Sequence, residues 1–406
     1  MNEWKRAPLG ELAETQLGKM LDQKKNAGEY HRYLGNDNVQ WNSFKLDEVK
    51  EMRFKSSELE RFRLRRSDLL VCEGGDPGRC ALWESDEEIY YQKALHRVRV
   101  GEELDARYLL YYLIHIGNTQ EIRQYYTGGA TIKHLPAVAL NRVVIKYPDL
   151  PTQRRIAGVL AAYDKLIESN RKQIKLLEEV AQRLYKKWFV DLHFPGHETT
   201  PIHDGLPVGW KRDSLLGRID YVRGRSYGSK DIRDTGAARL INLNNVASFG
   251  GWNAGAEKPY SGAHKKEQVV RGGDIVMAVT DMTKERRLVG HVARIPKDAS
   301  GGIISMDLIK IVPKDMTPNY LYAHLRFSGV AEMIATLANG TNVIHLKPEA
   351  LSRVILLIPS KDLQVAYANY LQPVFDAIEV SRRQIAAARE TRDRLLPKLM
   401  SGEIEV

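Results

Sequence analysis

The sequence predicts a mixed α+β protein in which one structural plan is written twice. Three observations predict this fold. Similar segments recur at a near-constant shift: Trp4 matches Trp210, and Gln153 matches Gln364. Two long segments, Gln153 to Phe189 and Gln364 to Met400, have the apolar spacing of amphipathic helices. A chain of 406 residues is also too long for one ordinary core, so we expect at least two domains.

Each copy begins with a globular part that mixes strands and helices. Short runs rich in aliphatic residues, such as DLLVCE and GDIVMAVT, are bounded by turn residues and predict strands. ARYLLYYLIHIGNTQEIRQYY and its counterpart PNYLYAHLRFSGVAEMIATLA have helical spacing. The predicted division of the chain is a globular domain at 1–150, a long helix at 151–190, a linker at 191–208, a second globular domain at 209–358 and a second long helix at 359–406.

The two long helices are expected to pack on each other as an antiparallel coiled coil. Apolar residues recur in both at alternating steps of four and three, and each seam holds one central polar residue, Asn170 or Ser381. Pro373 predicts a break or kink near Leu371, and Pro397 predicts the end of the second helix. The predicted helix-pairing residues are Ile156, Leu160, Ile167, Asn170, Ile174, Leu177, Leu184, Leu371, Ile378, Ser381, Ile385 and Leu395.

Composition favours an anionic partner and a reducing compartment. The net charge of +10 and the pI near 9.3 indicate nucleic acid ahead of a membrane surface, although a charged soluble surface explains them equally well. No run of 18 apolar residues occurs, and the beginning of the sequence lacks the pattern of a secretory signal. Cys72 and Cys80 are the only cysteines, which predicts reduced thiols in a cytoplasmic protein.

Motifs of catalysis are absent from the sequence. It contains no GxxxxGK[ST] phosphate loop, no strand-GxGxxG-helix pattern and no HExxH zinc motif. We therefore predict no catalytic residues and no metal site in this chain.

Basic, amide-rich and glycine-rich segments instead recur in both copies and predict DNA binding. LGKMLDQKKN matches VRGRSYGSKDIR, TDMTKERR is a second basic loop, and TGGATIKHL matches ANGTNVIHL. Arg and Lys neutralise phosphates or bind guanine, and Asn pairs with adenine. For any single residue a solvated loop is the simpler interpretation. The predicted DNA-binding set is Lys19, Lys24, Lys25, Asn36, Asn38, Arg79, Thr131, Lys133, Arg223, Arg225, Tyr227, Lys230, Asn242, Asn244, Asn245, Lys284, Arg286, Arg287, Thr341 and Asn342.

Two variable globular halves, each ending in a segment like RVVIKYPDLPTQRRIAGVLAAYDKLIESNRKQ, with GLPVGWK opening the second, resemble the specificity subunit of a type I restriction–modification system. The resemblance covers essentially the whole chain and is specific in the helices and the linker. The acidic residue that usually precedes the glutamine at the start of each helix is missing before Gln153 and Gln364. Tyr185, Trp188 and Phe189 are candidates for partner contact or, equally, for core packing.

The resemblance implies that each globular half is a target-recognition domain for one part of a bipartite DNA sequence, with the helices setting the unread spacer. It implies double-stranded DNA, two adenine methyltransferase subunits and restriction (motor-nuclease) subunits as partners, and no membrane. S-adenosylmethionine, ATP and Mg²⁺ would belong to the partner subunits, and this chain would not be an enzyme. Two alternatives stay open: a coiled-coil scaffold without DNA readout, and a self-contained DNA-modifying enzyme with an unrecognised site.

Overall fold

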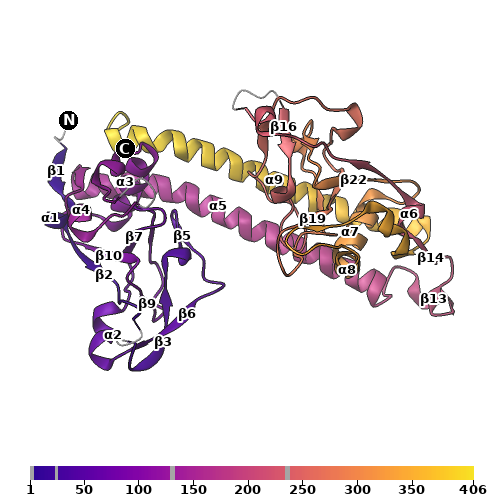
Figure 1. Cartoon of the computed structure of the whole chain (residues 1–406), viewed down its shortest axis with the longest axis horizontal. Coiled ribbons are helices and arrows are strands. Elements are labelled where there is room, and N and C mark those ends of the chain that lie inside the picture. Colours follow the sequence, from indigo (N-terminus) through magenta and orange to yellow (C-terminus); the bar gives the residue numbers. More distant parts are fainter. Residues whose placement is uncertain (1–3, 23–25, 129–132, 234–237) are drawn as a thin grey trace. The chain divides into compact units, whose positions relative to one another are not determined.

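The computed structural model describes residues 4–22, 26–128, 133–233 and 238–406, and it divides the chain into two compact units (Figure 1). Unit 1 comprises Met1–Glu168 and Ile385–Val406, and unit 2 comprises Ser169–Gln384. Each unit holds one globular repeat together with parts of two long helices, α5 (Leu150–Tyr185) and α9 (Lys361–Ser401). The predicted duplicated α+β fold with two long helices is therefore confirmed.

The globular repeat of unit 1 is built on a four-stranded antiparallel sheet. Its strands lie in the order β2 (Ala13–Leu17), β10 (Leu95–Val100), β7 (Leu69–Cys72) and β8 (Cys80–Leu82). Helix α3 (Ala106–Asn118) packs its buried leucines and tyrosines into the same core. The other elements are β1 (Lys5–Pro8) paired with β11 (Val144–Tyr147), the sheet β6 (Lys50–Phe54), β3 (Glu29–Leu34) and β9 (Tyr90–Tyr91), the hairpin β4 (Val39–Gln40) and β5 (Ser43–Phe44), and helices α1 (Leu9–Leu12), α2 (Ser56–Phe62) and α4 (Ala137–Asn141).

Unit 2 repeats this arrangement with small additions. Its four-stranded sheet has the equivalent order β15 (Ile219–Arg223), β22 (Leu308–Pro313), β18 (Ile275–Ala278) and β20 (Val292–Arg294). Helix α7 (Pro318–Phe327) takes the place of α3. The other elements are β14 (Lys211–Ser214) paired with β24 (Ile355–Ile358), the sheet β17 (Lys258–Tyr260), β16 (Ala238–Ile241) and β21 (Ile303–Ile304), the pair β19 (Thr280–Asp281) and β23 (Ile344–His345), β12 (Ile202–His203) and β13 (Leu206–Pro207) in the linker, and helices α6 (Leu215–Arg218) and α8 (Val330–Thr336).

The recurring glutamine at the start of each long helix has the same structural function in both units. Gln153 is fully buried; its amide nitrogen donates to the carbonyl of Pro148 at 2.9 Å, and its side-chain oxygen accepts from the backbone N–H of Asp105 at 2.8 Å. Gln364 repeats both bonds, to the carbonyl of Pro359 at 2.9 Å and from the N–H of Thr317 at 3.1 Å. The glutamine thus ties the long helix to the turn before α3 or α7.

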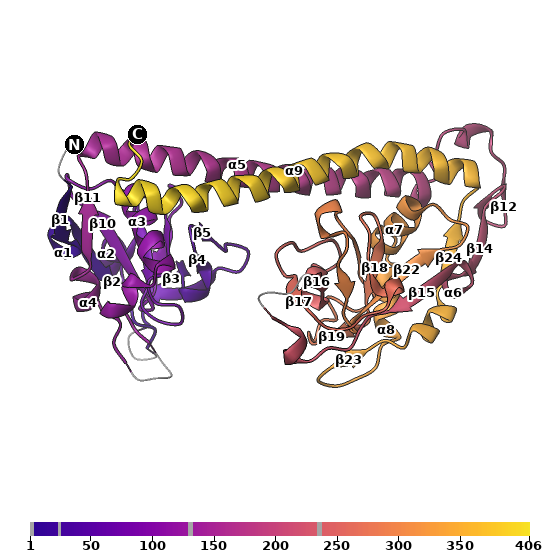
Figure 2. The same cartoon turned by 90° about the horizontal axis from the view of Figure 1, so that it is seen from above.

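Within each unit, α5 and α9 run antiparallel (Figure 2). In unit 1, Ile156 near the start of α5 shares a core with Leu399 near the end of α9. In unit 2, the ring of Tyr185 at the end of α5 contacts that of Tyr367 near the start of α9, with centroids 6.5 Å apart. Trp188 lies in a π-helical turn, Lys186–Val190, that extends α5, and its side chain is buried in the core of unit 2. Tyr185, Trp188 and Phe189 therefore serve core packing.

Helix α9 continues through both prolines, so the expected end at Pro397 is wrong, and of the break or kink expected near Leu371 the break does not occur. A proline inside a helix removes one backbone hydrogen bond and costs about 3 kcal/mol. Phe375 is buried in the core of unit 2 close to Pro373, and Leu396 and Leu399 are buried in that of unit 1 on either side of Pro397. Burial of such apolar side chains, at roughly 1.5–3 kcal/mol each, offsets this cost.

Most of the predicted helix-pairing residues face the interior of their units. The two polar members are among them, since Asn170 is 3% exposed and Ser381 is 1% exposed. A buried polar residue in an apolar seam is a common determinant of register. The buried members are Ile156, Leu160, Ile167, Asn170, Leu371, Ile378 and Ser381, and the half-buried members are Ile174, Leu177, Leu184, Ile385 and Leu395.

Candidate nucleic-acid interface

A glycine after the first strand of each four-stranded sheet precedes a predicted DNA-binding cation. Gly18 follows β2, and Gly224 follows β15. A Cβ atom at Gly18 would lie 2.4 Å from a backbone carbonyl oxygen of the adjacent segment, and one at Gly224 would lie 1.8 Å from such an oxygen. Only glycine permits so close a backbone approach. Lys19 and Arg225, the next residues, therefore leave the sheet at equivalent places.

These two cations have different environments. Lys19 is only 4% exposed; its ammonium donates to the carbonyl of Arg53 at 2.7 Å and pairs with Glu58 at 2.5 Å. Arg225 is exposed, and its guanidinium makes no hydrogen bond or ion pair within the part of the chain that the structure describes. Lys19 is thus used by the fold of unit 1, whereas Arg225 is available to an anionic partner.

Arg225 lies in a shallow hollow on unit 2 that is lined by two further cations, Arg223 and Lys265, and by Gln268. Arg223 pairs with Glu349 at 2.6 Å, and both side chains of this pair are about 60% exposed. A surface pair of this kind contributes little to stability and is readily exchanged for another anion. The hollow is therefore suited to binding phosphate groups.

Two further predicted residues, Tyr227 and Lys230, belong to the same basic segment, VRGRSYGSKDIR. The ammonium of Lys258 lies 5.8 Å from the ring centre of Tyr227, a cation–π contact, and Lys230 is exposed. In the matching segment of unit 1, and in the first glycine-rich turn, three predicted residues lie outside the described residues: Lys24, Lys25 and Thr131.

The asparagines predicted to read adenine are mostly used for structural hydrogen bonds. The side-chain oxygen of Asn38 accepts from the backbone N–H of Gly35 at 2.9 Å, and that of Asn245 accepts from the N–H of Asn242 at 3.0 Å. Both caps stabilise a short 3₁₀ helix. The shift that matches Trp4 with Trp210 predicts that Asn38 is equivalent to Asn244. The structure corrects this prediction, because the residue with the same hydrogen bond as Asn38 is Asn245.

The other asparagines of the predicted set differ in exposure. Asn242 is buried, and its side chain accepts from the N–H of Asn244 at 3.0 Å and donates to the carbonyl of Ala256 at 2.6 Å. Asn244 itself is exposed. The side-chain oxygen of Asn36 is buried without a hydrogen-bond partner among the described residues. A base contact by Asn38, Asn242 or Asn245 would require the loss of an existing hydrogen bond, so the prediction loses its support at these three positions.

The end of each glycine-rich turn pairs with a second loop, which in unit 2 is the predicted basic loop. Thr280, where the basic loop of unit 2 begins, pairs with His345 at the end of the second glycine-rich turn. In unit 1, Gly74 pairs with His134 in the same way, and His134 closes the turn by exchanging backbone hydrogen bonds with Thr127 at 2.8 and 2.9 Å. The exposed members at these loops are Lys133 in unit 1 and Lys284, Thr341 and Asn342 in unit 2.

A buried carboxylate holds the basic loop of unit 2 in one conformation. Asp281 is fully buried and accepts hydrogen bonds from the backbone N–H and the hydroxyl of Thr283 at 2.7 and 2.8 Å. It also accepts from the N–H groups of Leu288 at 2.6 Å and Val289 at 3.0 Å. Burial alone would raise the pKa of Asp281, but these hydrogen bonds outweigh it and lower the pKa below its usual value. The carboxylate therefore stays ionised and the loop is preorganised.

Besides Arg223, three arginines of the predicted set have contacts inside their own unit. The guanidinium of Arg286 donates to the carbonyl of Ala335 at 2.7 Å, and that of Arg287 lies 3.5 Å from Glu285. In unit 1, Arg79 donates to the carbonyl of Asn36 at 3.0 Å. Arg79 and Arg286 thus orient loops of the candidate interface.

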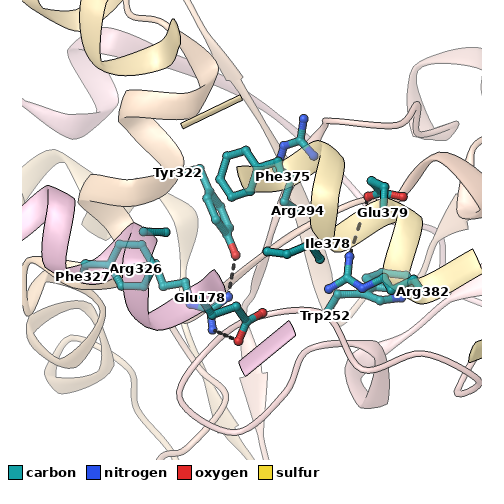
Figure 3. A pocket seen from close by; sticks show the side chains of 11 residues that line it. Glu178, Trp252, Arg294, Tyr322, Arg326, Phe327, Phe375, Ile378, Glu379 and Arg382 are labelled. Atoms are coloured by element: carbon teal, nitrogen blue, oxygen red, sulfur yellow. Dashed lines mark hydrogen bonds and ion pairs between the residues drawn. The ribbon is translucent and has the colours of Figure 1, made fainter. Parts of the chain in front are cut away.

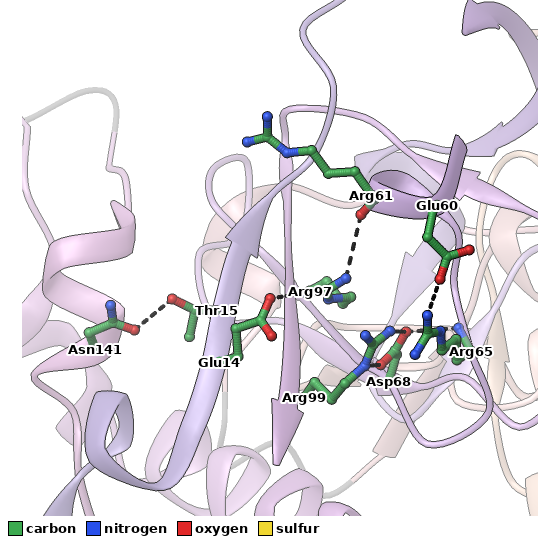
Figure 4. Close-up of polar contacts among 9 residues, drawn as sticks. All are labelled: Glu14, Thr15, Glu60, Arg61, Arg65, Asp68, Arg97, Arg99 and Asn141. Carbon is green, nitrogen blue, oxygen red and sulfur yellow. Dashed lines mark hydrogen bonds and ion pairs between the residues drawn. The ribbon is translucent and has the colours of Figure 1, made fainter. Parts of the chain in front are cut away.

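Charged side chains also support the sheet of unit 1 (Figure 4). Asp68 is 1% exposed and forms a two-bond pair with Arg99, at 2.7 and 2.8 Å. Arg97, which is 3% exposed, pairs with Glu14 of β2. Since buried charges are costly unless they are paired, these contacts fix the strands that carry the loops.

A small cavity of about 20 Å³, partly open to solvent, lies in unit 2, where α7 meets the long helices (Figure 3). Arg326 spans it, donating to the hydroxyl of Tyr322 at 2.6 Å and pairing with Glu178 of α5 at 3.2 Å. The guanidinium of Arg294 lies 4.5 Å from the ring centre of Phe375, and burial lowers its pKa. The cavity has room for one water molecule, so these residues join the helices to the repeat and form no ligand site.

Sequence reasoning missed the carboxylates that organise these loops. Asp281 and Asp164 were not singled out, although each is a hub of hydrogen bonds. Asp281 stands between two threonines in a basic loop, a pattern typical of a loop-closing acid. Asp164 in the first copy matches Phe375 in the second. A charged residue at a position that is apolar in the other copy was the signal that could have identified Asp164. Among the described residues no group of three His, Cys, Asp or Glu side chains is arranged to hold a metal ion.

The fold and these loops define a protein with two repeated polar loop clusters, one on each unit. Comparisons with known proteins show what the chain is similar to. Residues 1–179 match the family model described as "Type I restriction modification DNA specificity domain". The chain is 27% identical over 308 residues, 73% of its length, to the type I restriction enzyme MjaIX specificity subunit of Methanocaldococcus jannaschii, of which 69% is covered. It is 21% identical to the HindI specificity subunit of Haemophilus influenzae, with both chains fully covered.

A solved structure shares the fold. The type I restriction–modification S subunit from M. genitalium superposes with a TM-score of 0.59 at 16% identity, covering 98% of this chain and 96% of that one. The chain is thus similar in sequence to type I restriction enzyme specificity subunits, and it shares the fold of a solved S subunit. In the part of the chain that the structure describes, no helix is long and apolar enough to cross a membrane.

Proposed function

We propose that this chain is the sequence-reading and scaffolding subunit of a type I restriction–modification complex, in which each repeat reads one part of a bipartite DNA target. The observation that carries the proposal is the duplicated loop cluster. In both units a glycine-positioned cation and a closed glycine-rich turn recur on equivalent strands. Two readers of similar design and different side chains match a target with two unlike parts.

The two long helices would set the unread spacer between those parts. At about 1.5 Å per residue, the 36 residues of α5 correspond to roughly 54 Å of helix. Half-sites one DNA turn apart are separated by about 34 Å, so a helix of this length is sufficient for such a spacing. Each helix contributes to both units, which makes its length the natural determinant of the gap.

The catalytic steps would belong to partner subunits. Two adenine methyltransferase subunits would dock on this chain and flip the target adenine out of the duplex. They would bind S-adenosylmethionine, and restriction subunits would bring ATP and Mg²⁺. Binding of double-stranded DNA by the complex and a non-enzymatic role for this chain follow from the same proposal.

Mapping methylated adenines tests the proposal. A methylation-free host would express this chain with the methyltransferase subunit encoded beside it, and a second culture would express the methyltransferase subunit alone. The expected result is one split motif, two short defined parts around a fixed gap, in the first culture only. A continuous motif, or methylation without this chain, would overturn the two-reader proposal, and absence of methylation in a complex that assembles would favour a scaffold without DNA readout.

A further inference from the structure

The hairpin tip at residues 248–251 of unit 2 holds an aromatic residue in a backbone conformation that bulky residues rarely adopt. Phe249 has a φ of +60°. In this left-handed region the Cβ atom of an L-residue comes close to a carbonyl oxygen, and only glycine avoids the cost. Gly250 and Gly251, with φ of +93° and +96°, continue the turn. The turn itself would be better served by a third glycine, so it does not explain the phenylalanine.

Packing does not explain it either. The side chain of Phe249 is 58% exposed and belongs to none of the core clusters of the described residues. Its described ring contact is edge-on to His291, with centroids 5.7 Å apart. An exposed apolar side chain on its own is ordinary, but an exposed one that also strains the backbone is typical of a functional position.

The strained residue is firmly held beside the basic loop. The backbone N–H of Phe249 donates to the carbonyl of Arg287 at 2.8 Å, and that of Gly251 donates to the carbonyl of Val292 at 2.8 Å. Arg287 belongs to the loop that the carboxylate of Asp281 closes. The backbone of Phe249 is therefore anchored to a preorganised loop that also exposes Lys284.

We infer that the ring of Phe249 is a DNA contact of unit 2, which stacks on the face of a base or wedges into a base step. The inference rests on the proposed function and names one contact within it. Aromatic side chains stack on bases because every base has a π face, and apolar wedges between base steps locally unstack the duplex. Lys284 and Arg287 would neutralise phosphates next to the contacted step. The strained backbone of Phe249 in the free chain is then the energetic cost of holding the ring exposed for DNA.

Relief of the backbone strain and loss of the DNA contact predict opposite effects of one substitution, on stability and on DNA binding. In Phe249→Gly the backbone penalty disappears, so the melting temperature of the full chain should stay level or rise by about 2 °C. The loss of stacking should weaken binding of the methyltransferase complex to its mapped target duplex by about tenfold. Phe249→Tyr, which keeps the ring, should bind within about threefold of the unchanged protein.

A matched control separates strain from contact. Ser67 of unit 1 is exposed and has a φ of +72°, so Ser67→Gly relieves the same kind of backbone penalty without removing a ring. It should leave DNA binding unchanged. A second readout uses 2-aminopurine placed at successive positions of the target duplex: its fluorescence should rise at one step with the unchanged complex and with Phe249→Tyr, but not with Phe249→Gly.

Each outcome decides something. If the unchanged complex discriminates its target from a scrambled duplex and Phe249→Gly discriminates equally well, the inference is wrong and the proposed function stands. If Phe249→Gly instead prevents assembly with the methyltransferase subunit in the absence of DNA, the ring is a protein contact, and the inference is also wrong. If the unchanged complex shows no discrimination, the proposed function and the inference fail together.

Discussion

The carboxylate of Asp164 in α5 pairs with the guanidinium of Arg392 in α9 at 2.5 Å, within unit 1. The same carboxylate accepts hydrogen bonds from the hydroxyl of Tyr111 at 2.5 Å and from the side-chain amide of Asn42 at 2.7 Å. One acidic group thus joins both long helices to α3 and to the β4–β5 hairpin tip. In unit 2 the repeat places Phe375 at this position, where it packs against Tyr322.

Removal of this carboxylate should destabilise unit 1. Asp164→Ala leaves the half-buried Arg392 without one of its carboxylate partners and removes hydrogen bonds from Tyr111 and Asn42, so we expect a loss of about 2 kcal/mol in the free energy of unfolding. Denaturant unfolding followed by circular dichroism measures it. Asp86→Asn, which breaks the exposed pair with Arg66, is the control and should have no measurable effect. Equal behaviour of the two variants would contradict the assigned role of Asp164.

The equivalent cations Lys19 and Arg225 should respond differently to substitution. Arg225→Ala should weaken DNA binding by the assembled complex and reduce the salt slope of the binding constant by about one, because one phosphate contact is lost. Lys19→Ala should instead lower the melting temperature, since it leaves Glu58 without its ammonium partner. Binding titrations over a salt series and thermal melts distinguish the two. An unchanged salt slope in Arg225→Ala would show that this guanidinium does not contact phosphate.

The capping asparagines should contribute to stability in both repeats. Asn38→Ala and Asn245→Ala each remove a capping side chain and leave a backbone N–H, half-buried at Gly35 and buried at Asn242, without its acceptor, which costs about 1–2 kcal/mol. Asn244→Ala, at an exposed neighbouring position, serves as the control and should be close to neutral in stability. Chemical denaturation of the three variants measures the difference. A destabilised Asn244 variant beside unaffected Asn38 and Asn245 variants would reverse the structural assignment.

Acid should destabilise unit 2 through a buried histidine. Burial lowers the pKa of His324 to about 4, and its Nδ1 lies 2.7 Å from the hydroxyl oxygen of Tyr185. The unfolded chain, with a histidine pKa near 6.5, binds a proton between about pH 6.5 and pH 4 that the folded chain excludes. The contribution of neutral His324 to the free energy of unfolding is therefore fully present above about pH 6.5. It falls by about 3 kcal/mol as the pH drops to about 4.

His324→Gln should remove this part of the pH dependence. Glutamine keeps a polar group near Tyr185 but does not titrate, so the difference in unfolding free energy between the two proteins should shrink as the pH falls from 7 to 4. Urea unfolding at a series of pH values measures that difference. Parallel pH profiles for the two proteins would show that His324 does not cause the acid sensitivity.

Sequence predicted those features of the fold that depend on local pattern. The repeat, the strand-like runs and the heptad seams could be read directly, because hydrophobic periodicity and matched positions such as Gln153 and Gln364 do not require coordinates. The continuation of α9 through Pro373 could not be read, because the burial of Phe375 that offsets the proline is a tertiary effect.

The candidate interface was less predictable for the same reason. Lys19 and Arg225 occupy equivalent places after a glycine, yet only a partner distant in sequence, Glu58, decides that Lys19 is buried. Asn38 and Asn245 have the composition of base-reading residues, but their hydrogen bonds close 3₁₀ turns. Composition identifies which groups can bind DNA, and only the fold decides which of them remain available.

The most direct test of the two-reader account is an exchange of one recognition domain. Residues 1–150 would be replaced by the corresponding domain of a family member with a different target, and the methylated adenines would be mapped in a methylation-free host with the methyltransferase subunit. The account predicts that one part of the split motif changes, while the other part and the gap stay the same. A change in both parts, or a motif unaltered by the exchange, would contradict it.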